Sequence, residues 1–151
     1  TNAYTLSGRK LEEVLPHLTY VRINITAAEP DRYGEIMGTK PERLHAVIEN
    51  IGQMVALKRK HNLPVTLGMQ MVLVPDYQDQ IIPLAKLACD LEVDYLIIKH
   101  CSEDEDGSFN LDYAEYQDMY ETIREAETYS TAKTFVSEKP FFPAKSILSS
   151  G

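Results

Sequence analysis

The chain has 151 residues and a net charge of −8, and 44% of its residues are hydrophobic and 25% charged. These values are ordinary for one globular domain with a real core, and they exclude a disordered chain. The negative charge argues against nucleic acid or an anionic membrane as the main partner, since both require clustered Lys and Arg. No apolar run approaches the ~20 residues that span a bilayer and no signal peptide opens the sequence, so we expect a cytoplasmic protein.

The only two cysteines, Cys89 and Cys101, lack the spacing of a metal site. A pair of reduced thiols in a cytosolic protein is the simpler interpretation. The acidic run at 103–108 could hold a hard cation, but such runs are more often solvated, so we predict no metal ligands in this chain. Because Thr1 is not preceded by Met, we expect a piece of a longer chain, a processed form or an engineered sequence.

The first elements expected are a short amphipathic helix at 9–15 and a strand at 19–26. Alternate residues of an extended strand point to opposite sides of a sheet. In this strand the two sides differ in chemistry, one apolar and the other able to form hydrogen bonds: Val21, Ile23 and Ile25 against Tyr20, Arg22, Asn24 and Thr26. The pattern predicts a sheet with helices on one face and a polar cavity on the other.

Residues 27–38 are expected to form a long loop, because three residues typical of turns interrupt them: Pro30, Gly34 and Gly38. Long loops after strands often carry functional residues. Thr39 and Glu42 have the spacing of a capping box, which predicts a helix that begins there and runs to about Lys60.

Strands and helices then alternate along the rest of the chain. Strands are expected at 65–74, 95–100 and, in the tail, 134–136, and helices at about 77–91 and 113–127. The alternation is typical of parallel strands joined by right-handed crossovers, and it predicts the α/β fold class. We expect one domain over residues 1–128, followed by a tail at 129–151 with at most one more strand and a flexible end.

The candidate site residues are polar side chains near the ends of the predicted strands: Arg22, Asn24, Gln70 and Lys99. Ligands of parallel α/β proteins bind at the carboxyl ends of the strands, and these groups suit a polar small molecule with hydroxyls or a carboxylate. Lys99 could also form a Schiff base with a carbonyl substrate. His100 is expected on the opposite side of its strand from Lys99.

Several segments, in their order along the chain, resemble radical SAM enzymes, in particular members with an added auxiliary-cluster (SPASM-type) region. They are Thr1–Asn2–Ala3, 20–25, 33–38, 47–51, 67–75 and 93–99. The resemblance covers roughly Thr1 to Glu127 and implies the later part of a partial (βα)6 TIM-type barrel. It also implies that the barrel binds S-adenosylmethionine beside a [4Fe-4S] cluster, which cleaves it reductively to start hydrogen abstraction from a substrate.

The resemblance also assigns positions in this sequence. Thr1–Asn2–Ala3 is similar to the family's Thr-Asn-Gly, with Ala in place of Gly, and Asn24 stands where the family usually has Ser. Gln70 lies on a strand that lines the cofactor site, and the segment from Ile97 to Lys99 matches the strand whose end passes the adenine. The cofactor-binding set implied is Arg22, Asn24, Gln70, Ile97 and Lys99, whereas the catalytic residues are unknown.

The family's Cys-x-x-x-Cys-x-x-Cys motif, whose thiolates hold the cluster, is missing from the sequence. The ligands of the cluster are therefore expected outside this chain, which alone should not run the reaction. We interpret the sequence as a fragment of a radical SAM enzyme rather than a cluster-free relative. Expected partners are the cofactor, an unknown substrate, and the missing barrel portion or another copy of the chain.

Two other hypotheses remain open. An aldolase- or isomerase-like (βα) barrel would use Lys99 as its reactive amine and need no iron. A non-catalytic α/β interaction domain would have no small-molecule site, and the polar faces of its strands would be in contact with water.

Overall fold

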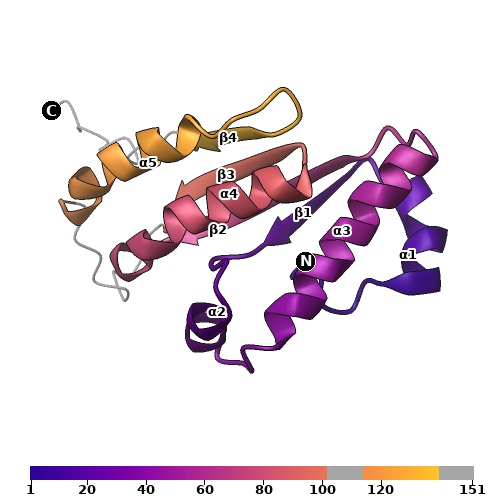
Figure 1. Cartoon of the computed structure of the whole chain (residues 1–151), viewed down its shortest axis with the longest axis horizontal. Helices are drawn as coiled ribbons and strands as arrows, with labels where there is room; N and C mark the ends of the chain where they lie inside the picture. The colour runs from indigo at the N-terminus through magenta and orange to yellow at the C-terminus, as the bar shows by residue number, and fades with distance from the viewer. Residues whose placement is uncertain (102–113, 140–151) are drawn as a thin grey trace, which may run out of the picture.

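A computed structural model describes residues 1–101 and 114–139, and in it four parallel strands form one sheet in the order β1-β2-β3-β4 (Figure 1). The strands are β1 (Tyr20–Asn24), β2 (Thr66–Leu73), β3 (Tyr95–His100) and β4 (Phe135–Glu138). Helical segments connect each strand to the next. The α/β fold class is confirmed, and so is the strand predicted in the tail, because β4 pairs with β3.

The α-helices are α1 (Gly8–Val14), α2 (Pro30–Met37), α3 (Arg43–Lys60), α4 (Ile81–Leu91) and α5 (Tyr120–Glu127). Three short 3-10 helices adjoin them: η1 (Leu15–His17), η2 (Pro75–Gln80) and η3 (Glu115–Met119). The helices predicted at 77–91 and 113–127 are therefore each a 3-10 turn followed by an α-helix. Among the described residues, no helix has the length and apolarity that crossing a bilayer requires.

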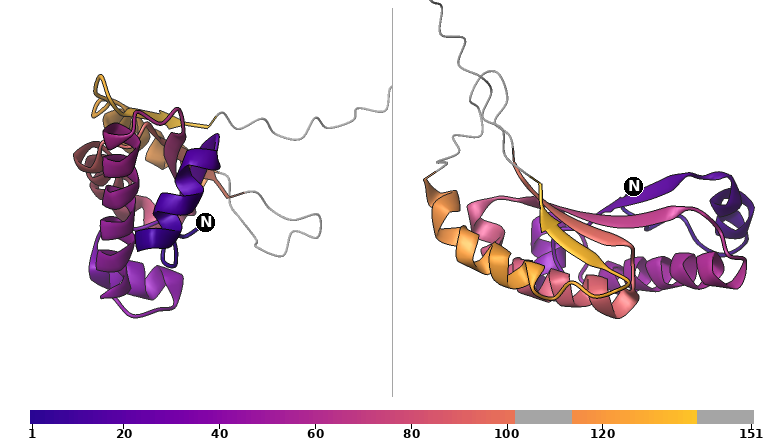
Figure 2. Two further views of the ribbon diagram at one scale, coloured as in Figure 1. Left: turned by 90° about the vertical axis from the view of Figure 1, so that its right-hand side faces the viewer. Right: turned by 90° about the horizontal axis from the view of Figure 1, so that it is seen from above.

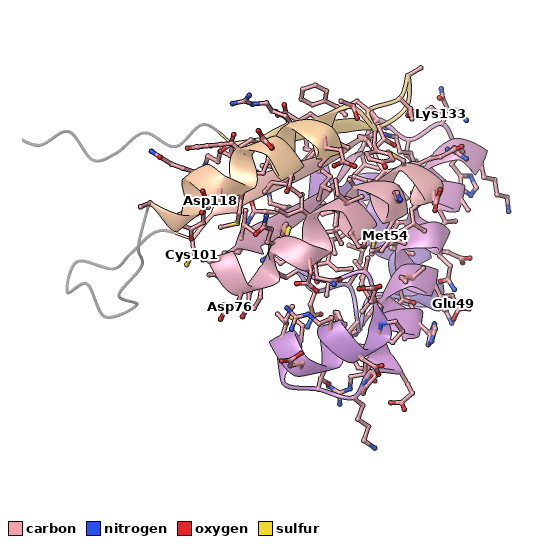
Figure 3. All side chains as sticks on the ribbon, turned by 60° about the vertical axis from the view of Figure 1, so that its left-hand side comes forward. Glu49, Met54, Asp76, Cys101, Asp118 and Lys133 are labelled. Atoms are coloured by element: carbon pink, nitrogen blue, oxygen red, sulfur yellow. The ribbon has the colours of Figure 1, made fainter. Side chains whose placement is uncertain are left out.

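Helices α3, α4 and α5 cover one face of the sheet, and among the described residues the opposite face, called here the open face, carries no such layer of helices (Figure 2). Right-handed crossovers between successive neighbouring strands place every connecting helix on the same side. The core lies between these helices and the sheet, where Ile23, Met69 and Ile98 are fully buried. Figure 3 shows Met54 of α3 within this layer and Glu49 at the surface.

The segment 27–38, predicted as a loop, contains the helix α2 instead. Pro30 is the first residue of α2, where its fixed φ is compatible with a helix and its missing N–H is not needed. Gly38 ends the helix in the left-handed conformation, with φ of 60°. Two of the three residues interpreted as breakers are therefore the boundaries of a helix, and the third, Gly34, lies within it.

The capping box predicted at Thr39 is wrong. Helix α3 begins at Arg43, its N-cap residue is Glu42, and no side-chain hydrogen bond caps it. The Thr39 N–H donates instead to the carbonyl of Gly34, so this residue belongs to the end of α2. The acidic run at 103–108 and the residues after 139 lie outside the described residues.

Candidate functional site

The open face of the sheet carries the alternate strand residues that point away from the helices. They are Tyr20, Arg22 and Asn24 of β1; Thr66, Gly68, Gln70 and Val72 of β2; Tyr95, Ile97 and Lys99 of β3; and Phe135 and Ser137 of β4. The five candidate residues from the sequence, Arg22, Asn24, Gln70, Ile97 and Lys99, all lie on this face. Strand alternation therefore predicted their orientation correctly.

Three of these residues form one row across the sheet. Asn24 is level with Gln70, and Gln70 is level with Ile97. The Gln70 side-chain N–H donates to the Asn24 side-chain oxygen at 3.4 Å, which is long for such a bond. The row therefore offers two amide groups with spare donors and acceptors beside an apolar side chain.

Arg22 lies in the next row toward the amino ends of the strands, level with Gly68 and Tyr95. The absence of a side chain at Gly68 lets the Tyr95 ring lie over it, since a Cβ there would be 2.0 Å from the ring's Cζ. The Tyr95 hydroxyl beside Arg22 raises the pKa of Arg22. Tyr95 was not a candidate from the sequence, although it shares the parity of Lys99.

Lys99 lies at the carboxyl end of β3, level with Val72 and half-buried. It is four residues beyond Tyr95, which corresponds to about 13 Å along the strand. The candidate residues thus share one face but occupy successive levels, and Arg22 and Lys99 do not meet. His100 lies on the opposite face as predicted, buried against the Tyr116 ring and in contact with Glu138.

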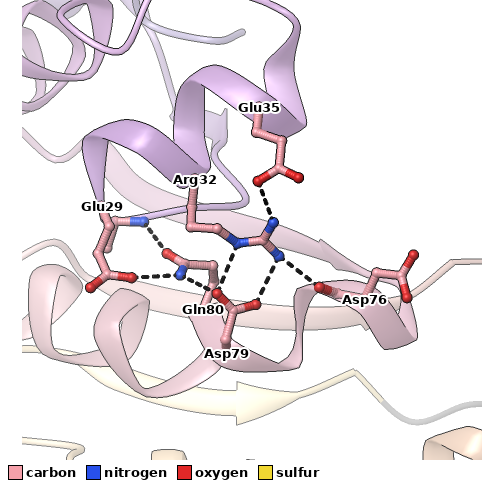
Figure 4. A network of polar contacts seen from close by, with 7 residues as sticks. Glu29, Arg32, Glu35, Asp76, Asp79 and Gln80 are labelled. Atoms are coloured by element: carbon pink, nitrogen blue, oxygen red, sulfur yellow. Dashed lines mark hydrogen bonds and ion pairs between the residues drawn. The ribbon is translucent and has the colours of Figure 1, made fainter.

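A network centred on Arg32 joins the segments that follow β1 and β2 (Figure 4). The Arg32 guanidinium donates two hydrogen bonds of 2.9 Å to the Asp79 carboxylate, one of 2.7 Å to Glu35 and one of 2.7 Å to the Asp76 carbonyl. The hydrogen bonds to Asp79 and Glu35 raise the pKa of Arg32, and Arg32 lowers the pKa of Asp79. With four hydrogen bonds to this neighbourhood, Arg32 has a structural role.

Gln80 extends this network into the protein interior, where it is fully buried. Its side-chain N–H groups donate to Glu29 and Asp79, each at 2.7 Å, and its oxygen accepts a hydrogen bond from the Ala28 N–H at 3.1 Å. The network holds the loop after β1 against the loop after β2 at the edge where ligands of parallel sheets bind. Sequence reasoning missed it because its partners lie about fifty residues apart.

Residues 1–3 lie along the outer edge of β1. The Thr1 amino group donates to the Arg22 carbonyl at 3.0 Å, and the Asn24 N–H donates to the Thr1 carbonyl at 2.8 Å. Ala3 is buried with φ of 60°, a conformation that favours Gly. The Asn50 side-chain amide of α3 donates to the Ala3 carbonyl at 2.8 Å and fixes the turn beside Arg22 and Asn24.

An iron–sulfur cluster does not fit the residues of this chain. A cluster of this kind is held by several thiolates, and the sequence has two cysteines. Burial raises the pKa of the Cys89 thiol, which donates to the Tyr129 carbonyl. Among residues 1–101 and 114–139, no group of three or more His, Cys, Asp or Glu side chains is arranged to hold a metal ion.

Two of the surface grooves among the described residues lie away from the open face. One, of about 540 Å³, runs between α1 with η1 and the end of α3, beside Leu15, Leu57 and His61. The other, of about 340 Å³, lies at the amino ends of the strands beside Leu67 and Ala132. The charged groups of the second groove already form ion pairs: Lys58 with Asp94, and Arg59 and Lys133 with Glu92.

The fold has a counterpart among solved structures. SuiB of Streptococcus suis matches with a TM-score of 0.65 and 18% sequence identity, over 93% of this chain and 32% of SuiB. The fold is shared. The structure of SuiB bound to S-adenosylmethionine matches equally well, with the same TM-score, identity and coverage. No family model matches the sequence, and no curated protein matches it. The four parallel strands with helices on one face thus agree with a partial (βα) barrel, and this chain spans about a third of the length of SuiB.

Proposed function

We propose that this chain is the later part of a radical SAM barrel and that its open face forms part of the cavity for S-adenosylmethionine and the substrate. Arg22, Asn24, Gln70, Ile97 and Lys99 line that cavity in this proposal. The observation that carries it is the shared orientation of these five side chains on one side of a parallel sheet. The likeness to a protein solved with S-adenosylmethionine bound supports it.

The chemistry of the row at Asn24, Gln70 and Ile97 fits this cofactor. Side-chain amides can pair with ribose hydroxyls and with the amino-acid part of S-adenosylmethionine, since each offers both donors and acceptors. The Ile97 side chain supplies apolar surface against which an adenine can pack. When bound, the cofactor would supply a sulfonium for reductive cleavage by a reductant outside this chain. The residues of this chain bind and orient it and exclude water.

The cluster that would reduce the cofactor belongs, in this proposal, to residues outside this sequence. The same holds for the rest of the barrel, which would cover the open face, whereas residues 1–3 already lie along the outer edge of β1. Tyr20 and Phe135 are 62% and 61% exposed on that face, and both would be covered in a completed barrel or by another copy of the chain.

Calorimetric titration of the chain with S-adenosylmethionine tests this proposal. The wild type is expected to bind it, and the double variant Asn24→Ala with Gln70→Ala to bind it at least about tenfold more weakly, because two hydrogen-bonding groups are lost. Gln117→Ala, an exposed amide on η3, is the matched control and should bind like the wild type. Equal affinity of the double variant and the wild type would contradict the proposal and favour a non-catalytic interaction domain.

The aldolase-like alternative is tested separately, because Lys99 lies on the same face. Borohydride added with a carbonyl substrate reduces an imine and leaves a stable adduct on the lysine that formed it. Our proposal expects no adduct at Lys99 by peptide mass mapping. An adduct at Lys99 that is lost in Lys99→Arg would replace the radical SAM proposal with the aldolase-like one.

A further inference from the structure

The outer edge of β4 has no neighbouring strand among the described residues. The Phe135 and Lys139 N–H groups point toward β3, because they donate to carbonyls on that side at 3.0 Å and 2.8 Å. Successive residues of a strand direct their backbone groups to opposite sides, so the N–H and C=O groups of Val136 and Glu138 point away from the sheet. These outward groups are the ones that another strand would use.

Side chains of this chain bond to each of the outward groups. The Ser130 hydroxyl accepts a hydrogen bond from the Val136 N–H at 2.9 Å and donates one to the Val136 carbonyl at 3.3 Å. The Glu127 carboxylate accepts from the Glu138 N–H at 3.0 Å, and the Ser137 hydroxyl donates to the Glu138 carbonyl at 3.1 Å. The outward N–H and C=O groups of both residues are therefore bonded within the chain.

Two of these side chains come from the end of α5 and the connection that follows it, which lies beside β4 (Figure 1). In an antiparallel pair, the residue opposite a bonded position takes both its N–H and its C=O. The Ser130 hydroxyl takes both of these groups at Val136, as such a residue would. Another strand can bond to Val136 only if it displaces this hydroxyl.

The opposite edge of the sheet is occupied in a different way. On β1 the bonds come from the main chain, since the Thr1 amino group donates to the Arg22 carbonyl and the Thr1 carbonyl accepts from the Asn24 N–H. One residue thus bonds on either side of Ile23, as a residue of a parallel neighbour does. The outer edge of β1 takes a main-chain partner, whereas the outer edge of β4 is covered by side chains.

We propose that Ser130 and Glu127 cover the outer edge of β4 so that neither a second copy of the chain nor an extended peptide adds a strand there. An edge strand with unpaired backbone groups is a template for pairing with another chain, and covering the edge prevents it. Phe135 of β4 is 61% exposed and would add apolar contact to such a pairing. The inference goes beyond the proposed function, because it does not depend on cofactor binding.

Sedimentation equilibrium of the full chain over a range of concentrations tests the role of the cover. The double variant Glu127→Ala with Ser130→Ala should dimerise at least about tenfold more tightly than the wild type, because two uncovered β4 edges can pair about a twofold axis. The conservative pair Glu127→Gln with Ser130→Thr keeps an acceptor oxygen and a hydroxyl at these positions, and it should associate as the wild type does.

A matched control removes the same kinds of group from the same region. Glu125→Ala with Thr128→Ala takes away one carboxylate and one hydroxyl, and the Thr128 hydroxyl donates to the Glu125 carbonyl rather than to β4. This variant has the same net charge as the double alanine variant at the edge. It should associate as the wild type does, so a change in charge alone would be recognised.

Amide hydrogen exchange measured by nuclear magnetic resonance tests the cover in the wild type. The Val136 and Glu138 amides should exchange at least about tenfold more slowly than unprotected amides, since both are hydrogen-bonded. Ser130→Ala should speed exchange at Val136 and leave Glu138 protected by Glu127. The wild-type measurement stands even if the double variant fails to fold.

Unprotected exchange of the two outward amides in the wild type would overturn the inference. A double variant that associates no more tightly than Glu125→Ala with Thr128→Ala would also overturn it, and so would a wild-type dimer that pairs through β4. Slow exchange in the wild type together with tighter association of the double variant is the result that the inference predicts.

Discussion

The two faces of the sheet are built from the same strands but have different roles. On β2, Met69 is fully buried beneath the helices, whereas the next residue, Gln70, is half-buried on the open face beside Asn24. The helix side is close-packed and apolar, so its residues determine stability. The open side has amides, two cations and exposed aromatic rings, so its residues are available for a ligand. Substitutions at adjacent residues such as Met69 and Gln70 can therefore test stability and ligand binding separately.

The largest expected effect comes from replacing Met69 with Ala. The side chain is 0% exposed, and its loss leaves a cavity in the core, so the free energy of unfolding should fall by about 2–5 kcal/mol. Gln70→Ala, one residue away, should change it by less than about 0.5 kcal/mol. Urea unfolding of both variants measures the difference. Comparable losses in the free energy of unfolding at the two positions would show that Gln70 is packed in the protein interior as Met69 is.

A smaller effect is expected at Gly68, where the open face itself is packed. The Cβ of Gly68→Ala would displace the Tyr95 ring, and we expect a loss of about 1–3 kcal/mol in the free energy of unfolding. Adding Tyr95→Ala should recover part of that loss, because the conflict is between these two side chains. Gly52→Ala in α3, where a Cβ meets nothing within 4 Å, is the control and should stabilise the protein by about 0.5–1 kcal/mol. If Gly68→Ala lowers the free energy of unfolding equally in the wild-type and Tyr95→Ala backgrounds, the Tyr95 ring does not pack over Gly68.

The turn beside β1 should respond in the opposite sense. Ala3 has a φ of 60°, so Ala3→Gly removes strain and should raise the free energy of unfolding by up to about 1 kcal/mol. Ala56→Gly, at an exposed position within α3, should lower it by about 1 kcal/mol. Thermal unfolding of the two variants checks the sign. Destabilisation by both changes would mean that Ala3 is not held in the left-handed conformation.

The smallest effect expected is a change in the pH dependence of the free energy of unfolding, caused by the ion pair between Arg32 and Asp79. Arg32 lowers the pKa of Asp79 below its ordinary value of 3.8, so this contribution to stability is present above that pH and is lost as the pH falls through the lowered pKa. Asp79→Asn should therefore be less stable than the wild type at neutral pH, and the difference should shrink in strong acid. Urea unfolding between pH 7 and pH 2 measures it. A difference that is constant over this range would argue against the ion pair.

Much of the sheet could be predicted from the sequence, because strand alternation is a local property. The period of two in β1 and β2 places Arg22, Asn24 and Gln70 on one face whatever surrounds them. The α2 helix was missed because Pro30 and Gly38 are typical of loops and also of helix ends, and their meaning depends on the residues between them.

Contacts between distant segments could not be predicted in the same way. Arg32 and Asp79 are 47 residues apart, and nothing local to either residue indicates the other. The hydrogen bond from Asn50 to Ala3 spans a similar separation. The Tyr95 ring over Gly68 depends on the register of β2 against β3, which alternation alone does not define. These contacts beside the candidate site could therefore be identified only in the structure.

The central claim is that a ligand binds on the open face, and a map of amide chemical shifts during titration with S-adenosylmethionine tests it most directly. The account predicts shifts concentrated at Asn24, Gln70 and Ile97, with the groove beside Leu57 and His61 unaffected. Shifts concentrated in that groove, or no saturable shifts on the strands, would contradict it.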